Sequence, residues 1–359
     1  MFKNARRIKR IFFILIIFLF LIFLLSRGHI YGNNELEYGI TFSKKQAESL
    51  GLDWRKVYLA ALDELGVKKI RLPAYWDEVE KNGNEYFWDD LDWQIAEAEE
   101  RGAEIILAVG GRLPRWPECH FPGWAEGLTK EEREAKILSY IEKVVSRYKE
   151  NKSIAAWQVE NEPFLAHFGD CPEVDGEFLD KEIALTRSLD VRPIVVTDSG
   201  ELSVWIPAAR RADIFGTTMY RDTYSRHLKM YIHYPIAPGF FRFKKNITRL
   251  FTPNLWDDCP AILNLTPLRQ LFCPKDAGFA KPDKWVVIEL QAEPWGPVPY
   301  QNLSKEERDR TMNLEKFREI IEFARLSGFK EFYLWGVEWW YWERAEGRPE
   351  MWEEAKVLF

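Results

Sequence analysis

Beyond residue 35 the chain alternates short apolar runs with longer segments in which apolar residues recur every three or four positions. The short runs have the composition of strands, whereas the longer periodicity is typical of amphipathic helices. Helices are predicted at 53–65, 90–101, 130–149, 177–189 and 304–326. Eight strands are predicted between them, at 38–42, 68–72, 104–109, 154–159, 193–197, 214–219, 285–290 and 329–335.

This alternation predicts an α/β fold with a parallel sheet, and eight strands are the number that closes a (β/α)8 TIM barrel. The runs 105–109 and 285–288 are apolar at every position, as in parallel strands that are buried on both faces. A doubly wound open sheet is the alternative, but no glycine-rich phosphate loop follows the first strand at 41–44. We therefore predict one barrel domain over 35–359, with an insertion at about 221–281 that is too long for an ordinary loop.

The first thirty residues have a different character. Residues 1–10 are basic, and an unbroken apolar run follows from Ile11 to Leu25. This order marks a membrane-targeting segment, and residues 26–30 contain no clear small-x-small cleavage site. Because the positive side stays cytoplasmic, we expect a transmembrane signal anchor at 11–30, a cytoplasmic flank at 1–10 and an extracytoplasmic barrel.

Composition narrows the possible partners. The net charge is −6 and no basic patch recurs after the N-terminus, so nucleic acid is not an expected partner. The chain has 16 Trp, 14 Tyr and 24 Phe, and many of the tryptophans stand in predicted loops. Indole faces in loops suit the C–H faces of sugar rings, which points to an oligo- or polysaccharide substrate.

The four cysteines all follow the predicted anchor, as expected for an exported protein. Four cysteines allow three pairings; Cys259–Cys273 is the preferred disulfide and Cys119–Cys171 the second choice. Metal binding is the competing interpretation, but the sequence has no Cys-x-x-Cys and only five scattered histidines. We expect neither a metal nor an organic cofactor.

Polar side chains stand where several predicted strands end. In a TIM barrel these positions meet at one face, where the active site lies. Two carboxylates from opposing strands can divide the work of glycosidic bond cleavage, one protonating the leaving oxygen and the other attacking the anomeric carbon. The residues at these positions are Arg71, Asn161, Glu162, Tyr220, Glu289 and Trp335.

With these residues the region from Tyr38 to Trp340 resembles the clan A retaining glycoside hydrolases, (β/α)8 barrels that include cellulase-like and β-galactosidase-like families. Each motif is weak alone, but their order along the chain is specific. The motifs are Ile70-Arg71-Leu72-Pro73, Gly83-x-x-Tyr86-x-Trp88-x-x-Leu91-Asp92, Pro114-x-Trp116-Pro117, Trp157-x-x-Glu160-Asn161-Glu162-Pro163, Thr218-Met219-Tyr220, Val287-Ile288-Glu289 and Tyr333-Leu334-Trp335-Gly336.

The resemblance implies that Glu162 is the acid/base, Glu289 the nucleophile and Asn161 a ligand of a substrate hydroxyl. Tyr220 would hydrogen-bond the nucleophile. From the residues themselves, Tyr220 and Arg71 could both donate to Glu289 and keep it ionised.

Glu293 competes with Glu289 for the role of nucleophile, because Glu293-Pro294 also looks like a strand end. Strand length favours Glu289 and leaves Glu293 as a rim residue that touches substrate or holds the loop. Trp335 is expected to form a platform for a sugar ring, and Trp116 to line an outer subsite. Glu160 should point away from Asn161 and is expected to be structural.

The sequence therefore predicts a membrane-anchored, extracytoplasmic retaining glycoside hydrolase that cleaves a β-linked carbohydrate with two glutamates. The same residues would serve a transglycosidase, in which a second sugar replaces water as the acceptor. A barrel that only binds glycans is the non-enzymatic alternative.

Overall fold

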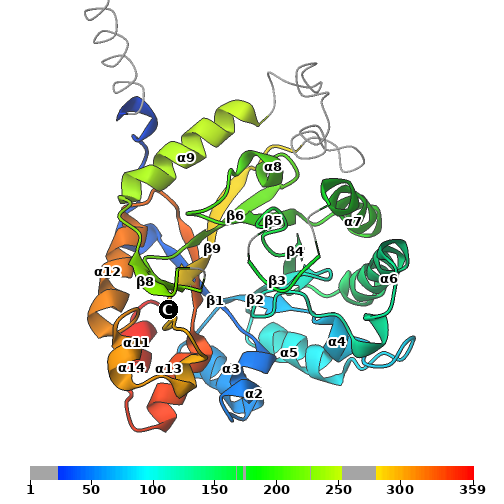
Figure 1. Cartoon of the computed structure of the whole chain (residues 1–359), viewed down its shortest axis with the longest axis horizontal. Helices are drawn as coiled ribbons and strands as arrows, with labels where there is room; N and C mark the ends of the chain where they lie inside the picture. Colours follow the sequence, from blue (N-terminus) through cyan, green and yellow to red (C-terminus); the bar gives the residue numbers. More distant parts are fainter. Residues whose placement is uncertain (1–22, 167, 173–174, 227, 253–279) are drawn as a thin grey trace, which may run out of the picture.

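The computed structural model describes residues 23–166, 168–172, 175–226, 228–252 and 280–359. Eight parallel strands close into a barrel in which β10 pairs with β1, and helices surround it (Figure 1). The predicted TIM barrel is therefore confirmed. The order around the barrel is β1 Glu37–Thr41, β2 Lys69–Pro73, β3 Glu104–Val109, β4 Ile154–Val159, β5 Ile194–Asp198, β6 Ile214–Met219, β9 Lys284–Gln291 and β10 Glu331–Trp335.

Helices cover the outside of the barrel and also follow its last strand. The longest is α6, which Thr129 caps by accepting from the backbone N–H of Glu132. The helices are η1 Asn33–Glu35, α2 Lys44–Ser49, α3 Trp54–Asp63, α4 Trp76–Val79, α5 Asp89–Glu100, η2 Gly123–Ala125, α6 Lys130–Tyr148, α7 Gly176–Leu189, α8 Ile206–Ala209, α9 Pro238–Phe251, η4 Tyr300–Asn302, α11 Lys305–Asp309, α12 Leu314–Arg325, α13 Val337–Ala345 and α14 Glu350–Lys356.

The apolar strands bury side chains on both faces, as their composition predicts. One cluster joins side chains of β3, β4, β5, β9 and β10, strands from opposite sides, so it fills the barrel interior. The larger cluster lies between the strands and the surrounding helices. The interior cluster consists of Ile106, Ala156, Val195, Val286, Ile288 and Tyr333.

Strand β9 contains a bulge that matters for the site. Its pairing register shifts against both neighbours between Val287 and Leu290. A bulge interrupts the alternation of side chains between the two faces. Ile288 accordingly belongs to the interior cluster, and the next residue, Glu289, also reaches the interior residue Arg71.

The predicted helix 304–326 is wrong as a single element, because the structure has two helices there. Helix α11 ends at Asp309, and α12 begins after Asn313, whose side chain accepts from the backbone N–H of Lys316. Between them, Thr311 exchanges hydrogen bonds with the backbone of Trp295 and accepts from Gln291 through its carbonyl. The break therefore serves to hold the loop that follows β9.

Within the predicted insertion, β7 Asp222–Ser225 and β8 Met230–His233 form an antiparallel hairpin that precedes α9. Figure 1 shows α9 along the outer edge of the barrel, with the start of the described chain at one end. There Asn246 donates to the carbonyls of Leu25 and Arg27. Residues 253–279, with Cys259 and Cys273, lie outside the described residues.

The predicted anchor at 11–30 lies mostly in residues 1–22, which are also outside the described part of the chain. From residue 23 onward, within the described ranges, no helix is both long and apolar enough to cross a membrane.

A buried ion pair joins helix α7 to the segment between α8 and β6. Arg211 donates to both carboxylate oxygens of Asp180 at 2.7 and 3.2 Å, and both side chains are buried. Removal of one partner of a buried, hydrogen-bonded ion pair is strongly destabilising. We expect Asp180→Ala to lower the free energy of unfolding by about 3–5 kcal/mol in urea titrations. Arg318→Ala, which breaks the exposed pair with Glu354, should change it little; equal effects of the two substitutions would contradict this.

Candidate active site

Two glutamates and an asparagine meet at the carboxyl end of the barrel strands. Asn161 and Glu162 follow β4, and Glu289 lies near the end of β9. The side chains are almost enclosed, with Glu162 5 % exposed and Glu289 4 % exposed. Burial raises the pKa of Glu162, and the negative charge of Glu289 raises it further. The two carboxyl groups therefore interact electrostatically.

Arg71 on β2 connects these groups. Its Nη1 donates to Glu289 Oε1 at 2.7 Å, its Nη2 to Asn161 Oδ1 at 2.5 Å, and its Nε to Gln158 Oε1 at 2.8 Å. The guanidinium is completely buried, and all three contacts are to oxygen. A planar fork with several donors fixes the orientation of every partner it contacts. Arg71 therefore positions Glu289 and Asn161 from the floor of the site.

Tyr220 supplies the second contact to Glu289. Its hydroxyl donates to Glu289 Oε2 at 2.9 Å, while its backbone N–H donates to Glu201 Oε1 at 2.8 Å. Burial and the charge of Glu289 hold the pKa of Tyr220 well above its usual value, so the hydroxyl remains a donor. Both oxygens of Glu289 thus accept a hydrogen bond, and the two predicted from the sequence, from Tyr220 and Arg71, are present.

Glu162 stands on a tight turn. Its φ is +42°, and its backbone N–H donates to Thr197 Oγ1 at 2.8 Å. Left-handed backbone at a residue other than glycine costs free energy and is typical of functional sites. Burial, together with the negative charges of Glu289 and Glu118, raises the pKa of Glu162 well above its usual value. The raised pKa favours the protonated form of this carboxyl, the form that a general acid needs.

Glu160 joins the loops that follow β3 and β4. Its carboxylate accepts the backbone N–H groups of Gly111 at 2.7 Å and Arg112 at 2.6 Å. Gly110 has a φ of +127°, and a Cβ there would lie 2.4 Å from Glu160 Oε1, so only glycine fits. The carboxylate of Glu160 thus has a structural role, because it binds the backbone of the loop after β3.

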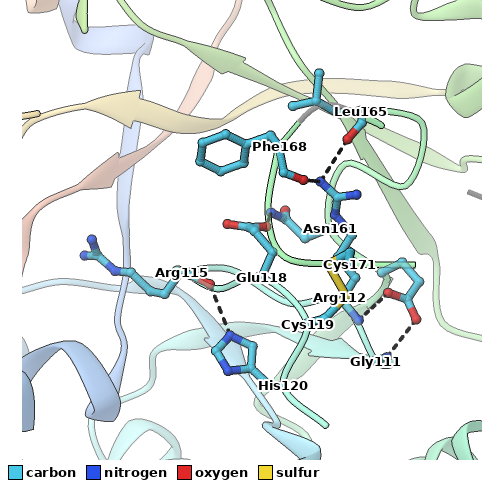
Figure 2. The surroundings of a disulfide bond; sticks show 11 residues. Gly111, Arg112, Arg115, Glu118, Cys119, His120, Asn161, Leu165, Phe168 and Cys171 are labelled. Carbon is cyan, nitrogen blue, oxygen red and sulfur yellow. Dashed lines mark hydrogen bonds between the residues drawn. A yellow bond between two sulfur atoms is a disulfide. The ribbon is translucent and has the colours of Figure 1, made fainter. Parts of the chain in front are cut away.

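A disulfide, Cys119–Cys171, strengthens the same connection (Figure 2). Beside it, Arg112 donates to the carbonyls of Leu165 at 3.1 Å and Phe168 at 2.8 Å. The second-choice pairing of the sequence analysis is therefore present. The loops after β3 and β4 form one cross-linked unit next to Asn161.

Glu118 is a third carboxyl in the site, and sequence reasoning missed it. Asn161 Nδ2 donates to Glu118 Oε2 at 2.8 Å, and the two side chains lie together in Figure 2. Burial, opposed by Arg112 and reinforced by Glu289, raises the pKa of Glu118 to about 8. Glu118 stands between Pro117 and Cys119 in a loop, so no strand end or motif marks it in the sequence.

Glu293 lies in a buried ion-pair cluster and not on an open rim. Arg115 Nη1 pairs with Glu293 Oε1, which also accepts from Trp335 Nε1 at 2.8 Å. Arg115 Nη2 donates to Glu338 Oε2 at 2.7 Å, and its guanidinium lies 4.1 Å from the centre of the Trp335 ring. Of the two predicted roles of Glu293, holding a loop is the one that these contacts describe. Nothing in the sequence indicated Arg115 or Glu338.

Trp116 is a surface residue at the rim. Its side chain is 53 % exposed, and the guanidinium of Arg226 lies 4.3 Å from its ring centre. The structure thus brings Arg71, Asn161, Glu162, Tyr220 and Glu289 into one site, with Trp335 beside them in the Arg115 cluster and Trp116 outside. No group of three or more His, Cys, Asp or Glu side chains within the described ranges is arranged to hold a metal ion.

Comparisons with known proteins concern the family and the fold. The cellulase family model (glycosyl hydrolase family 5) matches residues 45–172, which include β2, β3, β4, Asn161 and Glu162. Mannan endo-1,4-β-mannosidase F of Aspergillus clavatus is 28 % identical over 113 residues, 30 % of this chain and 26 % of that protein. β-Galactosidase BgaA of Clostridium cellulovorans is 21 % identical over 295 residues, 68 % of this chain and 44 % of that protein.

The chain thus spans less than half the length of the curated relatives it matches. Among solved structures, xylanase 10B from Thermotoga maritima has the same fold, with a TM-score of 0.51 and 15 % identity over 85 % of this chain and 84 % of that one. The predicted resemblance to the clan A glycoside hydrolases is confirmed, and the matched proteins are named for different substrates.

The buried carboxyls predict how stability depends on pH. A carboxyl whose pKa is about 8 when folded and about 4.5 when unfolded binds its proton more tightly in the folded state. Its contribution to stability is complete below pH 4.5 and is lost as the pH rises through 8. We expect the free energy of unfolding to fall over this window, and Glu118→Gln to make the fall shallower by up to about 1.4 kcal/mol per pH unit. Urea titrations at several pH values test this.

The surface variant Glu126→Gln is the control and should keep the slope of the unmodified protein. A slope for Glu118→Gln equal to that of the control would show that Glu118 does not titrate in this window.

Proposed function

We propose that this protein is a retaining glycoside hydrolase that cleaves a β-linked carbohydrate, with Glu162 as acid/base and Glu289 as nucleophile. One observation carries the proposal: Glu289 is held through both oxygens by Arg71 and Tyr220, opposite a carboxyl whose pKa is raised. Two carboxyls kept in different protonation states are what a double displacement requires. A barrel that only binds glycans would not need this arrangement.

In the first step Glu162 donates its proton to the glycosidic oxygen while a carboxylate oxygen of Glu289 bonds to the anomeric carbon. The carbon–oxygen bond to the leaving group breaks, and the leaving group departs as an alcohol. Arg71 and Tyr220 keep Glu289 oriented for this attack. The product is a glycosyl ester of Glu289.

In the second step Glu162 acts as a base. The ester of Glu289 carries no charge, so one of the causes that raise the pKa of Glu162 is absent in the intermediate. Glu162 accepts a proton from water, the hydroxide attacks the anomeric carbon, and the bond to Glu289 breaks. A second sugar in place of water would give transglycosylation with the same residues.

Asn161 and Trp335 orient the donor sugar in this proposal. Asn161 Oδ1 is committed to Arg71 and one Nδ2 hydrogen to Glu118, which leaves the other hydrogen for a substrate hydroxyl. Arg115 covers one face of Trp335, so a sugar ring can contact only the opposite face.

The substrate is proposed to be a neutral sugar. Each of the three arginines around the site is already engaged: Arg71 with Glu289, Arg112 with two backbone carbonyls, and Arg115 with Glu293 and Glu338. A uronic acid would bring a further negative charge into a buried site that already holds the carboxyls of Glu118, Glu162 and Glu289. The names of the two curated relatives, a mannosidase and a galactosidase, also refer to neutral sugars.

Substitution of the two glutamates tests the mechanism. Glu289→Gln should lower kcat on an aryl β-glycoside by at least about 10⁴-fold, because no covalent ester can form. Glu162→Gln should lower it about 10²–10⁴-fold for poor leaving groups and far less for dinitrophenol, which needs no protonation. In the unmodified enzyme the rate should fall as the pH rises through the pKa of Glu162, and this limb should be absent in Glu162→Gln.

The surface variant Glu126→Gln controls for the substitution itself. A 2-deoxy-2-fluoroglycoside inactivator should label Glu289, as read by mass spectrometry of the digested protein. Label on Glu293, or full activity of Glu289→Gln, would contradict the assignment.

We further propose that the chain is held in a membrane by residues 11–30, with the barrel on the extracytoplasmic side. The support is the order of basic and apolar residues in 1–25. The full chain should sediment with membranes, resist alkaline carbonate and be open to protease added outside sealed spheroplasts. Release of the intact chain by carbonate would contradict the proposal.

A further inference from the structure

The catalytic groups are almost completely buried. Asn161 and Tyr220, like the two glutamates, are no more than 8 % exposed without any substrate present. A groove that binds a polymer along its length must be open at both ends, which would expose the side chains on its floor. The burial of these side chains therefore requires that part of the barrel mouth is covered.

One side is closed by Arg115. This residue comes from the loop after β3, but its guanidinium pairs with Glu293 after β9 and Glu338 after β10. In the closed barrel β3 and β9 are separated by three strands on one side, β2, β1 and β10, so they face each other across the barrel. Figure 2 shows the Arg115 side chain extending away from the disulfide. The Arg115 bridge, defined as Arg115 with Glu293 and Glu338, thus crosses the mouth.

The ends of β1 and β2 are joined to the Arg115 bridge. The backbone N–H of Ser43 donates to Glu338 Oε1 at 2.6 Å, and Ser43 Oγ lies 2.8 Å from the hydroxyl of Tyr75. Tyr75 in turn donates to the carbonyl of Pro114, next to Arg115. The bridge and these contacts cover the sector of the mouth formed by β10, β1 and β2.

The bridge is held firmly at its origin. Glu160 binds two backbone N–H groups at the start of the β3 loop, and the disulfide Cys119–Cys171 fixes its far end. The Arg115 side chain is itself buried between the two carboxylates. An ion pair enclosed in this way cannot separate without leaving unpaired buried charges. A substrate cannot readily displace it.

The chemistry determines which part of the substrate meets the bridge. Glu162, which follows β4, protonates the glycosidic oxygen, so the leaving group lies on the Glu162 side. The rest of the donor sugar extends away from Glu162, toward Trp335 on β10, which lies opposite β4 in the barrel. The guanidinium of Arg115 is 4.1 Å from the Trp335 ring centre. A second sugar on the non-reducing side would need the space that Arg115, Glu293 and Glu338 occupy.

A second contact narrows the mouth elsewhere. Phe168 of the β4 loop stacks on Trp295 of the β9 loop with ring centres 5.8 Å apart. Trp295 also packs edge-on against Tyr220, at 5.1 Å. Contacts across the mouth thus come from both the β3 and the β4 loops.

We propose that this enzyme acts at chain ends, removing single neutral sugars from the non-reducing end of a β-linked glycan, because the Arg115 bridge limits the donor side of the site to one sugar. This inference rests on the proposed function. It assigns Arg115, Glu293 and Glu338 to specificity, whereas Glu162 and Glu289 carry the bond cleavage.

The unmodified full-length protein provides the first test. The substrates are β-1,4-linked manno-, xylo- and gluco-oligosaccharides and β-galactosides that carry a fluorophore at the reducing end, with aryl β-monosides and aryl β-biosides alongside. For the sugar that is accepted, we expect labelled products that shorten by one unit at a time. We also expect the aryl monoside to be cleaved at least tenfold faster than the aryl bond of the bioside.

The possible outcomes separate the two proposals. Internal fragments at the earliest times, or release of an intact disaccharide from the bioside, would overturn chain-end action and leave the hydrolase assignment standing. No cleavage of any glycoside and no labelling of Glu289 by the fluorosugar would overturn the proposed function, and this inference with it.

Removal of the bridge is the second test. Arg115→Ala should raise the rate of aryl release from the bioside relative to the monoside at least tenfold. Because that variant leaves two buried carboxylates unpaired, the triple variant Arg115→Met, Glu293→Gln, Glu338→Gln provides a neutral replacement. Arg318→Ala removes an arginine far from the mouth, in its pair with Glu354, and should keep the original ratio. An unchanged ratio in a folded triple variant would show that the bridge does not limit the site.

Discussion

The completely buried guanidinium of Arg71 is the interaction on which the site depends. A charge inside a barrel must be matched by an opposite charge and by acceptors for its donors. Glu289 supplies the charge, while Asn161 and Gln158 supply acceptors. Glu289, the nucleophile in our proposal, therefore also stabilises the buried charge of Arg71.

Burial also raises the pKa of Glu162, the acid/base of the proposed mechanism. Glu289 accepts hydrogen bonds from the Tyr220 hydroxyl and from the Arg71 cation. Burial and neighbouring negative charges, in contrast, raise the pKa of Glu162. Glu118 adds a third carboxyl to the same small volume, and its pKa is raised as well. Burial and neighbouring negative charges thus raise the pKa of both Glu162 and Glu118.

The loops after β3 and β4 decide the shape of the site. They are cross-linked by the carboxylate of Glu160 and by Cys119–Cys171, and from this unit Arg115 reaches the opposite side of the mouth. Loops carry specificity on a TIM barrel, while the strands beneath position the chemistry. Our inference of chain-end action concerns these loops and their partners after β9 and β10, Glu293 and Glu338. The catalytic glutamates would be the same in an enzyme with an open groove.

The eight strands, the barrel and the residues at the strand ends were predictable from the sequence, because a parallel strand buried on both faces needs a continuous apolar run. The break in the helix 304–326 and the bulge that turns Glu289 inward were not, because both satisfy contacts between distant segments. Glu118 and Arg115 stand in an irregular loop without periodicity. Only the tertiary structure, by closing the barrel and cross-linking its loops, brings them to the catalytic residues.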